Sequence, residues 1–120
     1  MGKKGEDVAC GLLEGMGHRI VARNFRKGHL EIDIVSTGAD GVHFVEVKSR
    51  MAPLSAEPEE NVTPSKQRKI AKAALGYLHG SKELGMAGCS EVHFDVVAVV
   101  FDGEEVRTEW FPDAFFPMYV

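Results

Sequence analysis

The spacing of apolar residues changes along the first half of the chain. Apolar side chains recur every three or four positions over residues 4–17, which predicts an amphipathic helix that ends at Gly17. Residues 19–24, 30–36 and 42–49 carry alternating or β-branched apolar residues instead, and these runs predict strands. Their connections are short, which favours an antiparallel meander because a parallel crossover needs a dozen residues or more.

The second half predicts one more helix and two more strands. Thr63 is a candidate N-cap, and Pro64 follows at the favoured first helical position. An apolar run over residues 92–101 is typical of a central strand covered on both faces, and residues 105–110 predict a last strand. Residues 51–62 hold prolines and acids without periodicity, which predicts a mobile loop. The order αβββαββ indicates an α/β (α+β) fold with a mixed five-stranded sheet flanked by helices.

Length and composition narrow the class of protein. A chain of 120 residues, 44% hydrophobic and 27% charged, is typical of one globular domain, here taken as residues 1–120. We find no apolar run of about 20 residues and no secretory signal pattern, so we expect a cytoplasmic protein with no membrane contact. Cys10 and Cys89 are too few for a disulfide framework and are expected to be buried. The net charge of −4 argues against a protein that coats nucleic acid non-specifically.

Charged residues within the apolar strands carry the chemical information. Side chains alternate along a strand, so Ile32 and Ile34 are expected on one face and Asp33 on the other. If residues 38–41 close the hairpin, the register places Asp33 opposite Glu46. Carboxylates whose Cβ atoms lie roughly 4.5 to 5.5 Å apart repel one another unless a proton or cation lies between them. Oxygen ligands without a nearby His or Cys favour Mg²⁺ (or Mn²⁺) over zinc.

Two further residues complete a candidate catalytic group. Lys48 shares a strand face with Glu46 and could orient a water molecule, and Glu6 on the inward face of the first helix could add a carboxylate. A metal ion beside a lysine is what phosphodiester hydrolysis requires. The alternative is a structural cluster in which Lys48 and Arg50 neutralise Asp33 and Glu46. The acid-x-lysine pattern within an apolar run, together with the inward acid, favours the catalytic interpretation.

Short motifs along the chain also resemble a known family. They are Gly5-Glu6, Asn24-x-Arg26, Glu31-Ile32-Asp33, Phe44-Val45-Glu46-Val47-Lys48-x-Arg50, Lys66 and Phe94-Asp95-Val96-Val97. In these motifs the chain resembles the bacterial YraN-like family. That family is similar to the PD-(D/E)xK restriction-endonuclease-like superfamily, especially the archaeal Holliday-junction resolvases. The resemblance implies a restriction-endonuclease-like core, a catalytic triad of Asp33, Glu46 and Lys48, and metal ligation by Glu6 and the backbone carbonyl of Val47.

The resemblance also implies a function. We expect a metal-dependent endonuclease that hydrolyses phosphodiester bonds in branched or structured DNA. Two alternatives stay open, which are a catalytically inactive nucleic-acid-binding module and a structural partner in a DNA-processing complex. Polar and basic side chains around the site are candidates for phosphate binding, although each is also compatible with plain surface. These residues are Arg23, Arg26, Arg50, Lys66, Gln67 and Lys69.

Other polar and aromatic residues have simpler interpretations. The five histidines show no paired spacing, which argues against a metal role for any of them. Asp95 is expected to be a structural acid bonded to neighbouring backbone or to an arginine. The aromatic tail over residues 111–120 is expected to close the core, and its density also suits a homodimer contact.

Overall fold

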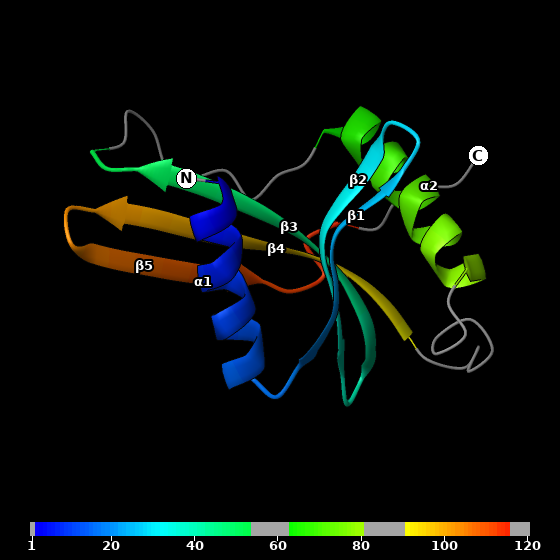
Figure 1. Cartoon of the computed structure of the whole chain (residues 1–120), viewed down its shortest axis with the longest axis horizontal. Helices are drawn as coiled ribbons and strands as arrows, with labels where there is room; N and C mark the ends of the chain where they lie inside the picture. Colours follow the sequence, from blue (N-terminus) through cyan, green and yellow to red (C-terminus); the bar gives the residue numbers. More distant parts are fainter. Residues whose placement is uncertain (1, 54–62, 81–90, 116–120) are drawn as a thin grey trace.

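The computed structural model describes residues 2–53, 63–80 and 91–115. The chain forms two helices and a five-stranded sheet in the predicted order αβββαββ, and Figure 1 shows how they are arranged. The strand order is β1-β2-β3-β4-β5, with β3 and β4 parallel and every other neighbouring pair antiparallel. The predicted mixed sheet is therefore confirmed. The elements are α1 (Gly2–Gly15), β1 (Arg19–Lys27), β2 (Leu30–Gly38), β3 (Gly41–Met51), α2 (Pro64–Gly80), β4 (Glu91–Asp102) and β5 (Glu105–Phe111).

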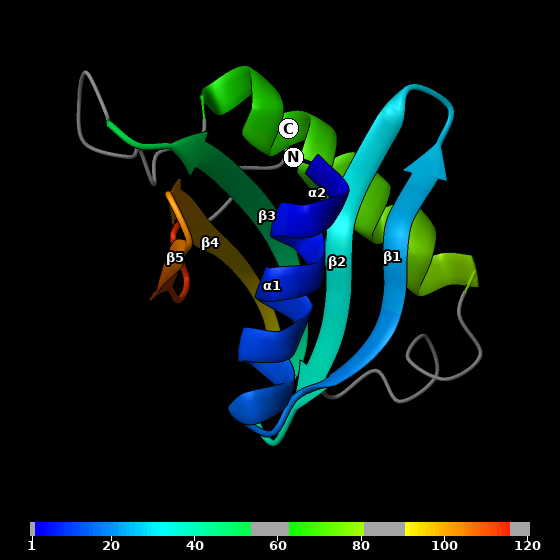
Figure 2. The ribbon, with the colours of Figure 1, turned by 60° about the vertical axis from the view of Figure 1, so that its left-hand side comes forward.

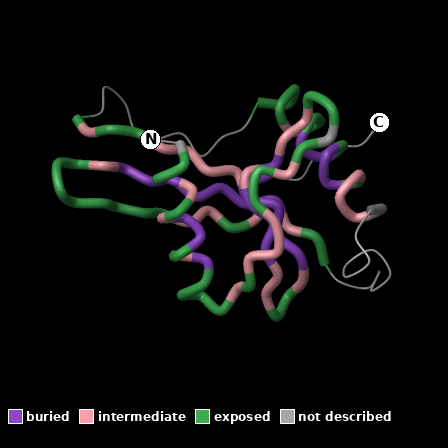
Figure 3. Tube along the Cα trace, in the orientation of Figure 1, coloured by how far each residue is buried: buried purple, intermediate pink, exposed green. Residues whose placement is uncertain are grey.

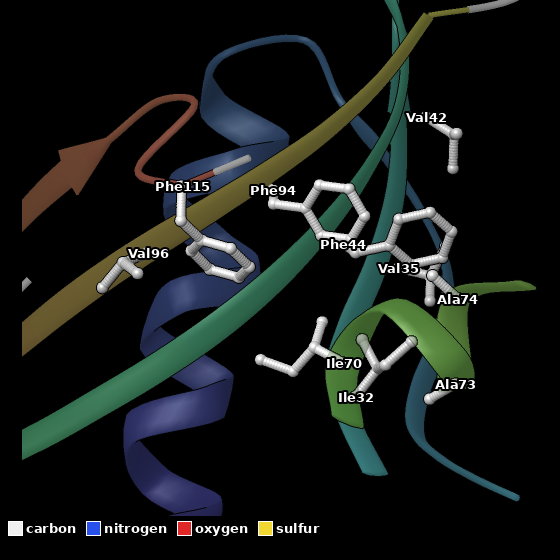
Figure 4. Packing of buried hydrophobic residues seen from close by; sticks show 10 residues of the cluster. All are labelled: Ile32, Val35, Val42, Phe44, Ile70, Ala73, Ala74, Phe94, Val96 and Phe115. Atoms are coloured by element: carbon white, nitrogen blue, oxygen red, sulfur yellow. The ribbon is translucent and has the colours of Figure 1, made fainter. Parts of the chain in front are cut away.

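The two helices lie on opposite faces of the sheet (Figure 2). Adjacent residues on the central strands point to different clusters, since Phe44 packs with the cluster under α2 and Val45 with the cluster under α1. Figure 4 shows the α2 cluster, in which Phe44 and Phe94 lie with ring centroids 5.6 Å apart. Buried residues run through the middle of the sheet, whereas the β4–β5 turn is exposed (Figure 3). Both faces of β3 and β4 are therefore apolar, as expected of central strands.

The helix ends follow their sequence signals. Gly17 has a φ of 94°, and the His18 N–H donates to the Leu13 carbonyl at 2.9 Å, which is the geometry of a left-handed glycine cap. At the start of α2, the Thr63 hydroxyl accepts a hydrogen bond from the Lys66 N–H at 3.2 Å. The predicted N-cap and the predicted stop are both confirmed.

Strand β2 departs from the alternation that its sequence predicts. Ile32 belongs to the cluster under α2, whereas Ile34 belongs to the cluster under α1. Their predicted common face is therefore wrong. On β1 the residue opposite this point is Asn24, whose φ of 52° lies in the left-handed region that Asn tolerates better than most residues. Asn24 thus lies opposite Asp33, at the point where β2 changes face.

Several expectations fall partly outside the described residues. Phe115 is buried in the α2 cluster and Phe111 packs against it, so this part of the tail closes the core as predicted. Cys10 is buried as expected. Cys89, residues 116–120 and most of the predicted loop over residues 51–62 lie outside the described part. Within that part, no helix has the length and apolar character required to cross a bilayer.

Candidate active site

The candidate site lies where the backbone pairing of β2 and β3 ends. This pairing runs from Gly38 opposite Gly41 to Ile34 opposite Val45, in the register that the turn predicted. Immediately beyond it, Asp33 Oδ2 accepts a hydrogen bond from the Val47 N–H at 2.8 Å. A side-chain acceptor thus satisfies a backbone donor at the end of the ladder. The Asp33 carboxyl group is therefore held between the two strands.

The structure brings Glu46 to the same place. Burial raises the pKa of Asp33 to about 7, with a further contribution from the negative charge of Glu46, while the Val47 hydrogen bond opposes the shift. The Glu46 side chain is only 11% exposed. Near neutral pH, the metal-free pair therefore tends to hold a proton between its carboxyl groups. Such a pair gains from any cation that can replace the proton.

The lysine in contact with this pair comes from α2 and not from β3. Lys66 Nζ lies 2.8 Å from Glu46 Oε2, and this contact raises the pKa of Lys66. Lys48 is half-buried and forms no ion pair with either acid among the described residues. Arg50 is exposed and donates to the Ser49 carbonyl at 2.8 Å. The alternative in which Lys48 and Arg50 neutralise the acids is therefore wrong.

Helix α1 supplies a third acid. Gly5 packs so closely on β3 that a Cβ at this position would overlap Ser49 Oγ. This approach brings the next residue, Glu6, near enough for its charge to raise the pKa of Asp33. Glu6 is 15% exposed and lies 3.6 Å from Arg23 Nη2, which also pairs with Asp7 at 2.8 Å. The acid cluster is therefore Asp33, Glu46 and Glu6, and an arginine holds the last of these.

The predicted phosphate-binding residues divide into two groups. Arg23, Arg26 and Lys66 each pair with an acid; the Arg26 partner is Glu31 at 2.9 Å. The side chains of Arg50 and Lys69 are exposed, and Gln67 is half-buried near the start of α2. Arg26 and Glu31 also line an open cavity of about 240 Å³ at the β1–β2 turn. Among the described residues, Arg50 and Lys69 are thus the exposed basic candidates for phosphate contacts that pair with no acid.

Sequence reasoning missed a second group of polar residues. His43 and His93 are partners in the parallel β3–β4 register, and their rings stack with centroids 4.5 Å apart. Asp95 accepts from His43 Nδ1 at 2.6 Å, from the Asp113 N–H at 2.8 Å and from Trp110 Nε1 at 3.2 Å. The prediction that Asp95 is a structural acid bonded to backbone or to an arginine is confirmed in its first form, through the Asp113 N–H. The histidines pair across strands, which spacing along the chain does not reveal.

Comparison with known sequences places the chain in a family. The profile described as "Uncharacterised protein family UPF0102" matches residues 5–99. The chain belongs to this family. The predicted YraN-like relationship is confirmed at that level. The matched region contains the three acids, Lys66, the histidine pair and Asp95, whereas Trp110 and Asp113 lie beyond it.

Individual UPF0102 proteins match most of the chain. One from Geobacter metallireducens is 40% identical over 115 residues, which are 96% of this chain and 91% of the relative. One from Syntrophus aciditrophicus is 42% identical over 114 residues, covering 95% and 87% of the two chains. One from Chloroherpeton thalassium is 41% identical over 101 residues, covering 84% and 75%. The chain therefore spans most of the length of these relatives.

Proposed function

We propose that this protein is a Mg²⁺- or Mn²⁺-dependent endonuclease of the PD-(D/E)xK type. The observation that carries the proposal is the close approach of the Asp33 and Glu46 carboxyl groups where the backbone ladder between β2 and β3 ends. Their interaction and burial raise the pKa of Asp33 to about 7. Two neighbouring carboxyl groups that are largely shielded from water favour a shared cation. Perturbed acids of this kind are more frequent at functional sites than elsewhere.

The donor set has the chemistry of a site for a hard divalent ion, although its three carboxylates are not gathered within 4.8 Å of one another, as the ligand atoms of Asp40, His43 and His93 are. Asp33, Glu46, Glu6 and the backbone carbonyl of Val47 would hold the ion, and these groups offer only oxygen atoms. When bound, such an ion polarises a phosphate oxygen and lowers the pKa of a bound water molecule. Imidazole and thiolate ligands, which select zinc, are not part of this set. The chemistry of the donors therefore agrees with Mg²⁺ or Mn²⁺.

The chain's own residues would position substrate and water. The Val47 N–H fixes the Asp33 carboxylate, and Lys66 balances the charge of Glu46 from the first turn of α2. Lys48 follows Glu46 by two positions on β3, so its ammonium group is proposed to orient the attacking water. Arg50 and Lys69 are exposed and are proposed to contact phosphates. DNA as the partner, and branched or structured DNA as the substrate, rest on the resemblance to Holliday-junction resolvases.

The direct test is cleavage of labelled four-way junction, flap and duplex DNA with Mg²⁺. We expect wild-type protein to cut at least one of these substrates and Glu46→Gln to be slower by about 100-fold or more, because the substitution removes a ligand charge. Glu109→Gln is the matched control, since Glu109 is an exposed acid on β5. Equal cleavage by wild type and Glu46→Gln would show that the activity does not come from this site.

One observation favours a second candidate function. Lys66 already provides a positive partner for Glu46, as in a binding protein that has kept the fold without turnover. A catalytically inactive nucleic-acid-binding module would bind DNA in EDTA, lose affinity steeply with salt and cut nothing. A structural role in a DNA-processing complex would show neither DNA binding nor cleavage. The homodimer stays a prediction, which sedimentation analysis would check.

A further inference from the structure

The second group of polar residues lies at the opposite end of the β2–β3 pairing from the acid pair. Gly38 pairs with Gly41, so Ala39 and Asp40 form the turn and the Asp40 carboxylate folds back over His43. A Cβ on Gly41 would overlap the carbonyl oxygen of Glu91, which shows how closely β4 approaches the turn. This approach places His93 beside His43. Residues far apart in sequence therefore meet at one end of the central strands.

Both imidazole rings are oriented by a carboxylate on the same nitrogen. His43 Nδ1 lies 2.6 Å from Asp95 Oδ2, and His93 Nδ1 lies 2.7 Å from Asp113 Oδ1. A carboxylate only accepts hydrogen bonds, so each Nδ1 carries a proton and donates it. Nε2 is then the atom on each ring that can bind a metal ion. A carboxylate behind a histidine is the usual outer arrangement of protein metal sites.

The two Nε2 atoms converge on one carboxylate. His43 Nε2 lies 2.8 Å from Asp40 Oδ1, and His93 Nε2 lies 3.5 Å from Asp40 Oδ2. Ligand atoms from Asp40, His43 and His93 all lie within 4.8 Å of one another. Metal–ligand bonds of about 2.0 to 2.1 Å in a tetrahedron separate the ligand atoms by about 3.3 Å. The three side chains are therefore spaced as the ligands of one small ion require.

We propose that His43, His93 and Asp40 form a zinc site, with the Glu91 carboxylate as a fourth ligand. Glu91 Oε1 lies 3.3 Å from His93 Nε2 but outside the group of three side chains whose ligand atoms lie within 4.8 Å of one another, so this 75% exposed side chain would have to turn towards the ion. Two imidazole nitrogens with carboxylate oxygens favour Zn²⁺, whereas Mg²⁺ prefers oxygen ligands alone. This site goes beyond the proposed nuclease function and does not depend on it.

The alternative is a cluster stabilised by protons alone. In that state His43 and His93 would each donate from both nitrogens and carry a positive charge. Their rings stack with centroids 4.5 Å apart at an interplanar angle of 15°, so the two positive charges would lie face to face. One divalent ion replaces these two repelling charges with a single shared centre. The proposed site is open to solvent on one side, because the Asp40 and Glu91 side chains are 55% and 75% exposed. His43, at 2% exposed, forms its buried side.

The consequence of zinc binding would be structural. The ligands come from the β2–β3 turn, from β3 and from β4, and Asp113 behind His93 follows β5. An ion at this point would join the turn, β3 and β4 at one end of the sheet. Because a bound ion stabilises only the folded form, it should raise the melting temperature.

Zinc binding can be measured separately from the acid site. Chelator-stripped wild-type protein and Glu46→Gln are dialysed against Zn²⁺ alone, and we expect both to retain one ion per chain. His93→Gln and Asp40→Asn should each weaken binding by at least about tenfold, the lower end of the loss seen even for outer groups. His29→Gln is the matched control, because His29 is exposed in the β1–β2 turn. Co²⁺ in place of Zn²⁺ should give visible absorption bands that His93→Gln loses.

Two outcomes would overturn the zinc site. One is a wild-type protein that retains no stoichiometric Zn²⁺ after dialysis. The other is Asp40→Asn and His93→Gln proteins that bind Zn²⁺ as tightly as wild type. Asp40 lies in an exposed turn, so this variant keeps the test valid if His93→Gln fails to fold. Failure of DNA cleavage leaves these measurements unaffected, since Glu46→Gln is expected to bind zinc normally.

Discussion

Asp33 experiences opposing effects whose balance defines the candidate site. The Val47 hydrogen bond favours the ionised carboxylate, while burial and the charge of Glu46 favour the protonated form. Burial and the charge of Glu46 outweigh the hydrogen bond and raise the pKa of Asp33 to about 7. The metal-free protein therefore keeps a proton where a metal ion would bind. The stability of the fold should depend on pH in a way that identifies this residue.

Replacing Asp33 with Asn should remove a specific part of the pH dependence. Folding raises the pKa of Asp33 from 3.8 to about 7, so its contribution is full below pH 3.8 and is lost as the pH rises towards 7. The largest slope is about 1.4 kcal/mol per pH unit. Urea unfolding in EDTA from pH 5 to pH 8 should show wild type losing stability relative to Asp33→Asn. Asn can still accept from Val47, so parallel curves would contradict the raised pKa.

Single residues also show what the sequence could reveal. The proximity of Asp33 and Glu46 could be predicted from the short turn and the antiparallel register that it sets, both of which are local, although the pairing itself ends at Ile34 and Val45. The contact of Lys66 with Glu46 depends on where α2 packs against the sheet. The contact of His43 with His93 depends on the parallel register between β3 and β4, two strands that are connected through α2. Such long-range placements leave no spacing signal. The exchange of Lys48 for Lys66 as the partner of Glu46 has this origin.

At the scale of elements, the helices and strands were predictable because each has its own periodicity and end signals. Thr63 and Gly17 mark helix ends by forming hydrogen bonds or torsions that few other residues supply. The exception is the change of face between Ile32 and Ile34. Alternation assumes regular strand torsions, and the left-handed torsion of Asn24 violates this assumption on the neighbouring strand. A sequence pattern alone does not report such a local torsion.

The close packing of α1 on β3 gives a prediction for Gly5. An alanine Cβ would overlap Ser49 Oγ and lie 3.1 Å from Ser49 Cβ, so α1 must shift away from the strand. We expect Gly5→Ala to lower the free energy of unfolding by about 1 to 3 kcal/mol, the usual range for overpacking. The shift would also move Glu6 and reduce cleavage.

Gly11→Ala is the matched control for the same helix. A Cβ at Gly11 meets nothing within 4 Å, so this substitution should stabilise α1 by up to about 1 kcal/mol. Urea denaturation of both variants measures the difference. If Gly5→Ala were as stable as Gly11→Ala, the close approach of α1 to β3 would be contradicted.

At the scale of the whole molecule, β3 connects the two polar groups. Side chains alternate along β3, so Glu46 lies on the same face as Phe44, towards α2, and His43 lies on the same face as Val45, towards α1. Three positions along a strand separate their Cα atoms by about 10 Å. Glu46 and His43 therefore lie on opposite faces of β3, and the two groups to which they belong are proposed to select different ions. Sites at this separation without shared partners usually act independently.

Chelation followed by selective return of metal ions should separate the two sites. EDTA is expected to abolish DNA cleavage and to lower the melting temperature. Adding Mg²⁺ alone should restore cleavage, because the acid cluster is the proposed catalytic centre. One equivalent of Zn²⁺ alone should restore the melting temperature but not cleavage. At a free Zn²⁺ concentration of about 100 times the Kd, the stabilisation is about 2.7 kcal/mol, a rise of roughly 10 °C for a chain of this size.

The matched variants connect each effect to its residues. Glu46→Gln should lose the Mg²⁺ effect on cleavage and keep the Zn²⁺ effect on melting, whereas His93→Gln should show the reverse. The reciprocal pattern follows from the different faces of β3 on which Glu46 and His43 lie. If Mg²⁺ restored the melting temperature of Glu46→Gln, or if Zn²⁺ stabilised His93→Gln as strongly as wild type, the assignment of ions to sites would be wrong. Melting curves and cleavage rates from the same stripped samples decide between these outcomes.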